Sequence, residues 1–121
     1  MRIGYATGYW KQGPPPGALR AVRTADRLGY ESVWTAEAYG SDAATILAWL
    51  AQATTTIKLG SAIFQMPGRS AAMTAMTAAT IDQLSDGRML LGIGPHPESA
   101  VDAWQRIDAF FSEHLATGTR A

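Results

Sequence analysis

The chain has 121 residues, 47% of them hydrophobic, a length that suits one modest globular domain with a single core. Ten basic and ten acidic residues give a formal net charge of zero, which argues against binding to nucleic acid or to an anionic membrane surface. The absence of cysteine excludes disulfides and thiolate chemistry, and no apolar run is long enough for a signal peptide or a membrane span, so we expect a cytoplasmic protein.

Short apolar runs alternate with longer segments of helical periodicity up to residue 94, a pattern typical of βα units around a parallel sheet. Residues 2–8 predict the first strand, and the prolines at 14–16 precede a predicted helix that Gly29 ends. The residues predicted to form the inner face of that helix are Ala18, Val22, Ala25 and Leu28.

The second unit begins with a predicted strand over residues 31–37. Ser41 is the predicted N-cap of a helix that starts at Asp42, where the helix dipole favours an acidic side chain. The residues that recur at helical spacing on its inner face are Ala43, Ile46, Leu47, Leu50 and Ala51.

The third and fourth predicted strands cover residues 56–64 and 88–94. Between them, Ser70 is the predicted N-cap of a helix, and Gly87 lies where a left-handed residue ends it. The predicted inner face of this helix consists of Met73, Met76, Thr77, Thr80, Ile81 and Leu84. The residues expected to tie its end to the fourth strand are Asp82, Asp86 and Arg88.

Three right-handed crossovers in succession predict an α/β fold, either half of a (β/α)8 barrel or a small doubly wound sheet. The chain has about half of the roughly 250 residues that a closed barrel usually takes. Residues 95–121 change in composition and predict a single amphipathic helix from about Pro97 to Leu115. The two histidines, His96 and His114, lack the spacing of metal ligands, so we expect no metal site.

Three segments of the chain, ESVWTAEAYGSDA, LGSAIFQMPGRS and TIDQLSDGRMLLGIG, resemble the N-terminal half of luciferase-like monooxygenases. They are most similar to the branch of oxidoreductases that use the deazaflavin coenzyme F-420. The most specific part is the Gly-Ser-Ala-Ile sequence that ends the third strand, followed at the family's spacing by DQLSDGR. The likeness covers residues 1–94 and implies a partial TIM barrel of about four βα units, with F-420 or FMN lying across the carboxyl ends of the strands.

The resemblance also implies which residues serve the site. It gives a catalytic role to Glu37, and it gives cofactor contacts to Ser61, Ala62, Ile63 and Gly94. Family members often have a cis peptide bond at the position that matches Ala62 and Ile63. Ala38 stands where bacterial luciferases carry a catalytic histidine, which favours hydride transfer over light-emitting oxygen chemistry.

Several of these residues have a second interpretation from the residue types alone. Glu37 can be an ion-paired loop residue, and Ser61 can bond to a neighbouring backbone. Gly94 either leaves room for a ring or serves a turn before Pro95. The Gly92–Gly94 segment lacks the third glycine and the downstream acid of a dinucleotide fingerprint, so we do not read it as a phosphate cradle.

Two departures from the family pattern matter. Ala71 stands where relatives commonly have proline, and after Gly94 the chain leaves the family pattern, in which later strands hold most of the cofactor phosphate site. We therefore expect a truncated oxidoreductase, dependent on F-420 or FMN, that transfers hydride to or from an unidentified small molecule and is weak or inactive alone. The alternative is a non-catalytic, oligomerising fragment of the same family, because an open half-barrel leaves sheet edges uncovered and favours a homo-oligomer. An independent doubly wound binding domain is the third hypothesis.

Overall fold

The computed structural model describes residues 1–10, 13–37 and 40–95. Strands and helices alternate along this part of the chain, as the sequence predicts. The elements are β1 (Gly4–Ala6), α1 (Ala18–Arg27), β2 (Ser32–Thr35), α2 (Ala43–Ala53), β3 (Lys58–Ser61), β4 (Phe64–Gln65), a short 3-10 helix (Met66–Gly68), α3 (Ala71–Leu84), β5 (Met89–Leu90) and β6 (Ile93–Gly94). The helix predicted from Pro97 to Leu115 lies outside the described residues.

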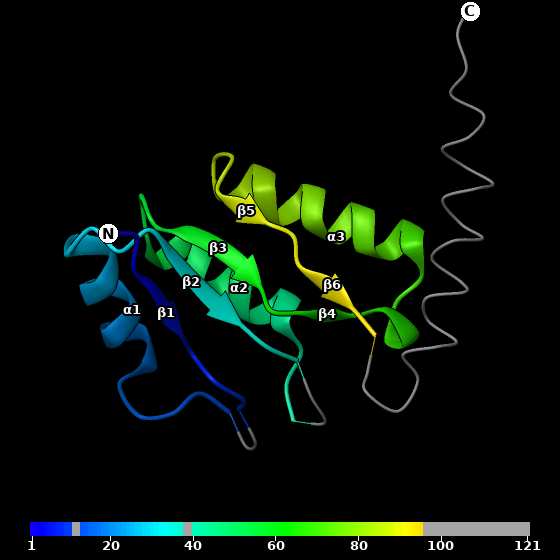
Figure 1. The fold of residues 1–121 in the computed structure, drawn as a ribbon, viewed down its shortest axis with the longest axis horizontal. Coiled ribbons are helices and arrows are strands. Elements are labelled where there is room, and N and C mark those ends of the chain that lie inside the picture. The colour runs from blue at the N-terminus through cyan, green and yellow to red at the C-terminus, as the bar shows by residue number, and fades with distance from the viewer. Residues whose placement is uncertain (11–12, 38–39, 96–121) are drawn as a thin grey trace, which may run out of the picture.

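The strands form a parallel sheet in sequential order, β1-β2-β3-β5, beside a parallel pair of β4 and β6 (Figure 1). This order confirms the prediction of an α/β fold built from successive βα units. The third and fourth predicted strands are each divided in two. Gly60 pairs with Leu90 and Phe64 with Ile93, so three residues of one chain segment lie opposite two of the other, and this mismatch interrupts the pairing.

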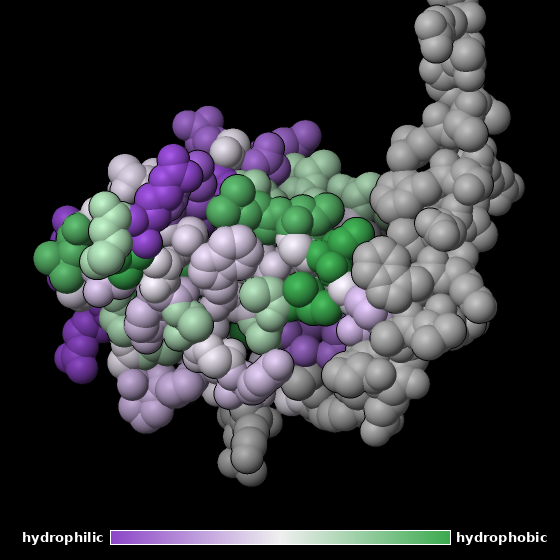
Figure 2. Space-filling model, viewed as in Figure 1, coloured by the Kyte–Doolittle hydropathy of each residue, from purple (hydrophilic) through white to green (hydrophobic). Residues whose placement is uncertain are grey.

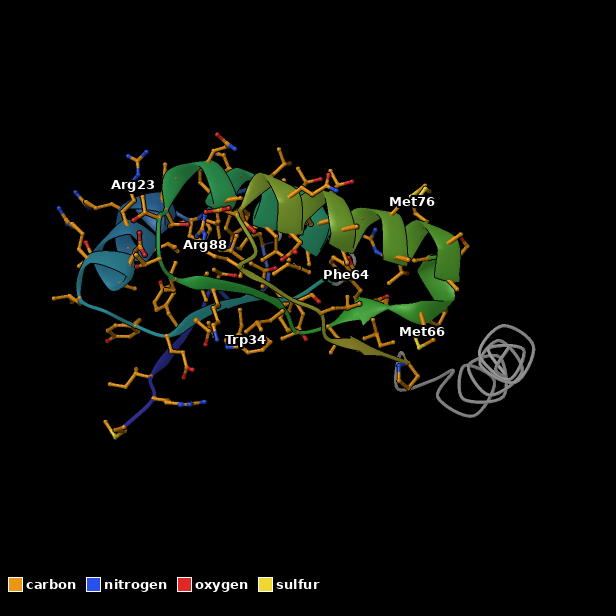
Figure 3. The ribbon with its side chains drawn as sticks, turned by 90° about the horizontal axis from the view of Figure 1, so that it is seen from above. Arg23, Trp34, Phe64, Met66, Met76 and Arg88 are labelled. Carbon is orange, nitrogen blue, oxygen red and sulfur yellow. The ribbon has the colours of Figure 1, made fainter. Side chains whose placement is uncertain are left out.

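Helices α1, α2 and α3 lie on one face of the sheet, as Figures 1 and 3 show from two directions. The strand residues that face them are fully buried: Val33, Thr35, Leu59 and Ser61. The hydrophobic core therefore lies between the sheet and the helices. No described helix covers the opposite face of the sheet, and none of the described helices has the length and apolar character needed to cross a membrane.

Helix α2 contributes most to the core, because all five residues predicted for its inner face are buried. Its N-cap is one residue later than predicted. Asp42, not Ser41, is the cap, and its Oδ1 accepts a hydrogen bond from the Thr45 N–H at 2.8 Å. Ser70 caps α3 as predicted, with its Oγ accepting from the Met73 N–H at 3.1 Å.

The buried faces of α1 and α3 differ from the prediction. Leu28 is 71% exposed because α1 ends at Arg27, so the helical spacing no longer applies to it. In α3, Met73, Met76 and Leu84 are about half exposed, and Ile81 is the buried residue. The partly or fully buried residues of α3 are Thr74, Thr77, Ala78, Ile81 and Asp82, so Thr77 and Ile81 are covered as predicted and Thr80 is exposed.

Two charged side chains fix the loops at the amino end of the sheet. The Asp26 carboxylate accepts hydrogen bonds from the N–H groups of Thr55, Thr56 and Ile57 at 2.7 to 3.0 Å. Burial alone raises the pKa of the Asp26 carboxyl, but these bonds and that from the Thr56 hydroxyl outweigh it and hold the pKa well below its ordinary value. Asp26 thus joins the end of α1 to the segment before β3.

Arg88 holds the segment before β5 against neighbouring loops. Its guanidinium donates to the carbonyl oxygens of Ala51, Thr54, Ile57 and Ser85 at 2.6 to 3.1 Å. The Asp82 Oδ1 accepts from the Met89 N–H at 3.0 Å. Arg88 and Asp82 therefore tie the end of α3 to β5, as the sequence predicts, whereas Asp86, the third residue predicted for this role, is exposed.

We expect Asp26→Asn to lower the free energy of unfolding by about 1 to 3 kcal/mol at pH 7, because both carboxylate oxygens accept bonds from the loop, whereas the amide keeps one acceptor oxygen, turns an NH2 donor toward other donors and lacks the charge. Since folding lowers the pKa of Asp26, its stabilisation is present above the ordinary value of 3.8 and is lost as the pH falls toward the folded-state value. Urea unfolding from pH 7 to pH 3 should show the two proteins converging in acid.

Asp86→Asn is the matched control. Asp86 is exposed with φ of 57°, a conformation that asparagine tolerates equally well. A midpoint for Asp26→Asn as high as that of this control at pH 7 would contradict the assigned role of Asp26.

Candidate functional site

The predicted site residues come together at the carboxyl edge of the sheet. Glu37 follows β2, Ser61 ends β3, and Gly94 ends β6. Ala62 and Ile63 connect β3 to β4. Because parallel strands end at the same edge, all five residues lie on one rim, and Ala38 lies outside the described residues.

The rim is apolar where β3 passes into β4, at Ala62 and Ile63. The peptide bond between Ala62 and Ile63 is cis, as the resemblance implies. Ala62 is exposed and Ile63 is half-buried. A Cβ atom on Gly94 would lie 2.4 Å from Ile63 Cδ1, so the space beside Gly94 is taken by the Ile63 side chain.

Ser61 is fully buried and bonds to the backbone of the neighbouring segment. Its Oγ donates to the Gly92 carbonyl oxygen at 2.8 Å and accepts from the Gly92 N–H at 2.9 Å. A Cβ on Gly92 would lie 2.2 Å from the Ser61 carbonyl oxygen. This close approach joins β3 to the link between β5 and β6, and the contact predicted between Ser61 and a cofactor stays a prediction.

Glu37 is the most heavily bonded side chain of the rim, and it is 8% exposed. Its Oε1 accepts from the Gln65 N–H at 2.6 Å and from Arg69 Nε at 3.1 Å. Its Oε2 accepts from the Ala43 N–H at 3.1 Å and from Arg69 Nη2 at 2.9 Å. Burial raises the pKa of the Glu37 carboxyl, but Arg69 and the two N–H groups outweigh it and lower the pKa below its ordinary value.

Arg69 was not among the predicted residues, although it lies in one of the segments that carry the resemblance. Its side chain is 16% exposed, and its Nη2 also lies 3.6 Å from Asp42 Oδ1. The guanidinium carbon lies 4.6 Å from the centre of the buried Phe64 ring, within range of a cation–π contact. Hydrogen bonding to Glu37 raises the pKa of Arg69.

Trp34 was likewise not predicted for the site, and it lies on the face of the sheet away from the helices (Figure 3). Its ring covers Gly60, where a Cβ would lie 2.2 Å from the indole. Its Nε1 donates to Ser32 Oγ at 2.9 Å. Leu91, in the link between β5 and β6, is 47% exposed and Ile93, in β6, is 40% exposed, and Figure 2 shows hydrophobic side chains gathered over β5 and β6.

Two other features lie apart from the rim. A groove of about 970 Å³ between α1 and the end of α2 is lined by none of the five predicted site residues. Among residues 1–10, 13–37 and 40–95, no three histidines or acidic residues are arranged to hold a metal ion, and His96 and His114 lie outside these ranges.

Comparison with known proteins identifies the class to which this fold and rim belong. The family model for luciferase-like monooxygenases matches residues 2–116, so the match extends beyond Gly94, where we end the resemblance. The chain belongs to the luciferase-like monooxygenase family. The boundary predicted at residue 95 stays a prediction.

Two curated relatives indicate the branch. The chain is 40% identical over 104 residues to a protein of Mycobacterium tuberculosis named as a coenzyme F-420-dependent oxidoreductase, covering 86% of this chain and 30% of the relative. It is 34% identical over 83 residues to the 5,10-methylenetetrahydromethanopterin reductase of Methanolobus tindarius, covering 68% of this chain and 26% of the relative. The chain therefore spans less than a third of these relatives.

Two solved structures share the fold. The coenzyme F-420-dependent tetrahydromethanopterin reductase of Methanopyrus kandleri gives a TM-score of 0.69 at 26% identity, over 86% of this chain and 30% of that one. A monooxygenase of Streptomyces bottropensis gives 0.75 at 23% identity, over 93% of this chain and 42% of that one. The described residues are thus part of a TIM barrel, as the resemblance implies.

We expect Gly92→Ala to lower the free energy of unfolding by about 1 to 3 kcal/mol, because the added methyl group meets backbone that must move. Gly68→Ala is the control, since a Cβ there meets nothing within 4 Å, and we expect a change of about 0.5 kcal/mol or less. Urea unfolding measures both. If the two variants unfold at the same urea concentration, the close approach of Gly92 to Ser61 contributes nothing to the stability of the contact between β3 and the link from β5 to β6.

Proposed function

We propose that this chain carries the ring-binding part of an F-420-dependent oxidoreductase, with FMN as the alternative cofactor. The observation that carries the proposal is the 40% identity, over 86% of the chain, to a relative named as an F-420-dependent oxidoreductase. A location in the cytoplasm, expected from the composition, is part of the same proposal.

The carboxyl rim suits one face of a flat ring. Ala62 is exposed and small, and the half-buried Ile63 fills the space beside the buried Gly94. When bound, a deazaflavin or flavin ring supplies a carrier for hydride. In this proposal Ala62 and Ile63 provide apolar contact, and Ser61 and Gly94 hold the backbone beneath the ring.

The residues described here supply part of a barrel, and the resemblance implies that most of the cofactor phosphate site lies on later strands of the family. Affinity for a cofactor with a ring at one end and phosphate at the other depends on holding both ends. Each loss of about 1.4 kcal/mol weakens binding tenfold, and a charged anchor contributes several times that amount. The proposal therefore includes weak binding and no turnover by the chain on its own.

Calorimetric titration of the 121-residue chain with F-420 and with FMN tests this proposal. We expect a dissociation constant in the high micromolar range or weaker, and Ala62→Glu should abolish binding because it places a charge and a long side chain on the rim. Ala79→Glu, an exposed position on α3, is the control and should bind as the unaltered chain does. Binding that is unchanged by Ala62→Glu, or absent altogether, would contradict the proposed ring site.

A non-catalytic role as an oligomerising fragment is the second candidate. The observation that favours it is the pair of large apolar side chains exposed next to β5, Leu91 at 47% and Ile93 at 40%. Large apolar side chains gathered on a surface favour association.

We expect the chain to sediment as a homo-oligomer, most simply a dimer, at micromolar concentration. Leu91→Lys should shift it toward the monomer, because it places a charge among the apolar side chains exposed beside β5, whereas Leu28→Lys, at an exposed position after α1, should not. A monomer that binds no dye specific for exposed apolar surface would contradict this role.

A further inference from the structure

We propose that Glu37 and Arg69 form a positioning pair, which holds the end of β2, the segment after β3 and the first turn of α2 in fixed relation, and that Glu37 is not the acid, base or nucleophile of the site. The effect of this pair on a bound ring rests on the proposed function, whereas the hydrogen bonds of the pair are independent of it.

The first argument is the number of donors around the carboxylate. An ionised carboxylate offers about four lone-pair positions to hydrogen-bond donors. Gln65 N–H and Arg69 Nε occupy those of Oε1, and Ala43 N–H and Arg69 Nη2 occupy those of Oε2. No position remains on Glu37 to take a proton from a substrate.

The second argument is what these donors belong to. Gln65 ends β4, and its side-chain Nε2 also donates back to the Glu37 carbonyl oxygen at 2.7 Å. Ala43 is the first residue of α2, so its N–H is a helix-end donor that needs an outside acceptor. One carboxylate therefore joins three elements that are separate in the sequence.

Arg69 completes the arrangement from the segment before α3. It binds Glu37 through two parallel hydrogen bonds, the geometry that a guanidinium and a carboxylate favour. Phe64 lies under the guanidinium, and Asp42 is the second carboxylate facing it. Because the Glu37 and Arg69 side chains are 8% and 16% exposed, removing either partner leaves the other as a largely buried charge without its counter-ion.

The position of the pair links it to the proposed ring site. Gln65 lies two residues after Ile63, and Glu37 two residues after the end of β2. Any movement of the pair displaces the backbone on which Ala62 and Ile63 stand. Glu37 thus acts on a bound ring through the rim and not by touching it.

The first test follows the amide signals of Gln65 and Ala43 by NMR as the pH is raised from 5 to 8. Both N–H groups donate to Glu37, so their chemical shifts report its ionisation directly. We expect both signals to stay constant over this range, and Glu37→Gln to shift both. A common titration step between pH 5 and 8 would reveal a carboxyl suited to proton transfer and would overturn the proposal.

The second test is a double-mutant cycle in urea with Glu37→Gln and Arg69→Met, the methionine keeping a long side chain over Phe64. We expect each single change to raise the unfolding equilibrium constant roughly tenfold or more. The double variant should show a rise at least about threefold smaller than the product of the two. Multiplicative effects would mean that Glu37 acts independently of Arg69 and would overturn the proposal.

Glu31→Gln is the matched control, because Glu31 precedes β2 as Glu37 follows it, and its pair with Arg2 is exposed to solvent. It should leave the unfolding constant within about twofold of the original. In titrations with F-420 and FMN, Glu37→Gln and Arg69→Met should weaken binding by similar factors. If the unaltered chain binds neither cofactor, the proposed function fails, while the amide signals and the cycle still decide whether the pair exists.

Discussion

Parallel pairing of strands on one side of a single helical layer is the constraint on which the rest of this structure depends. Parallel sheets are normally covered on both faces, because their strands are hydrophobic throughout. Here α1, α2 and α3 cover one face, and on the other Trp34 lies over Gly60. No described helix covers that second face.

Hydrogen bonds from polar and charged side chains hold both edges of the sheet, but their partners differ. At the amino edge, Asp26 and Arg88 bond mainly to backbone groups of loops, and these bonds hold the loops in place. At the carboxyl edge, Glu37 bonds to backbone and to Arg69 together, and Ser61 exchanges two bonds with Gly92. The carboxyl rim is therefore rigid beneath a surface that carries few polar groups.

The sequence predicts those features of the fold that depend on residues close together in the chain, such as helix faces and helix caps. Helix α2 follows its apolar spacing completely, because large aliphatic residues leave one choice of inner face. Helix α3 does not, since alanine, threonine and methionine pack almost equally well on either side. The choice between Ser41 and Asp42 as a cap is a shift of one residue, and both types can fill that position.

The partners of the rim residues could not be read from the sequence. Arg69 lies 32 residues from Glu37, and Gly92 lies 31 residues from Ser61, so neither contact leaves a local pattern. The rim residues themselves were found only through the resemblance to a family. Periodicity places a strand across residues 56–64 and gives no sign that it is divided in two.

The pairing of β1 with β2, of β2 with β3, and of β3 with β5 has a consequence for how such a chain folds. Gly4 pairs with Ser32, Ser32 with Lys58, and Leu59 with Met89, so every strand finds its partner one unit away in the chain. Each closure orders a loop of similar, moderate length, and its entropic cost does not grow as the sheet widens. The sheet can therefore assemble progressively, one βαβ crossover after another, with each completed unit serving as the template for the next.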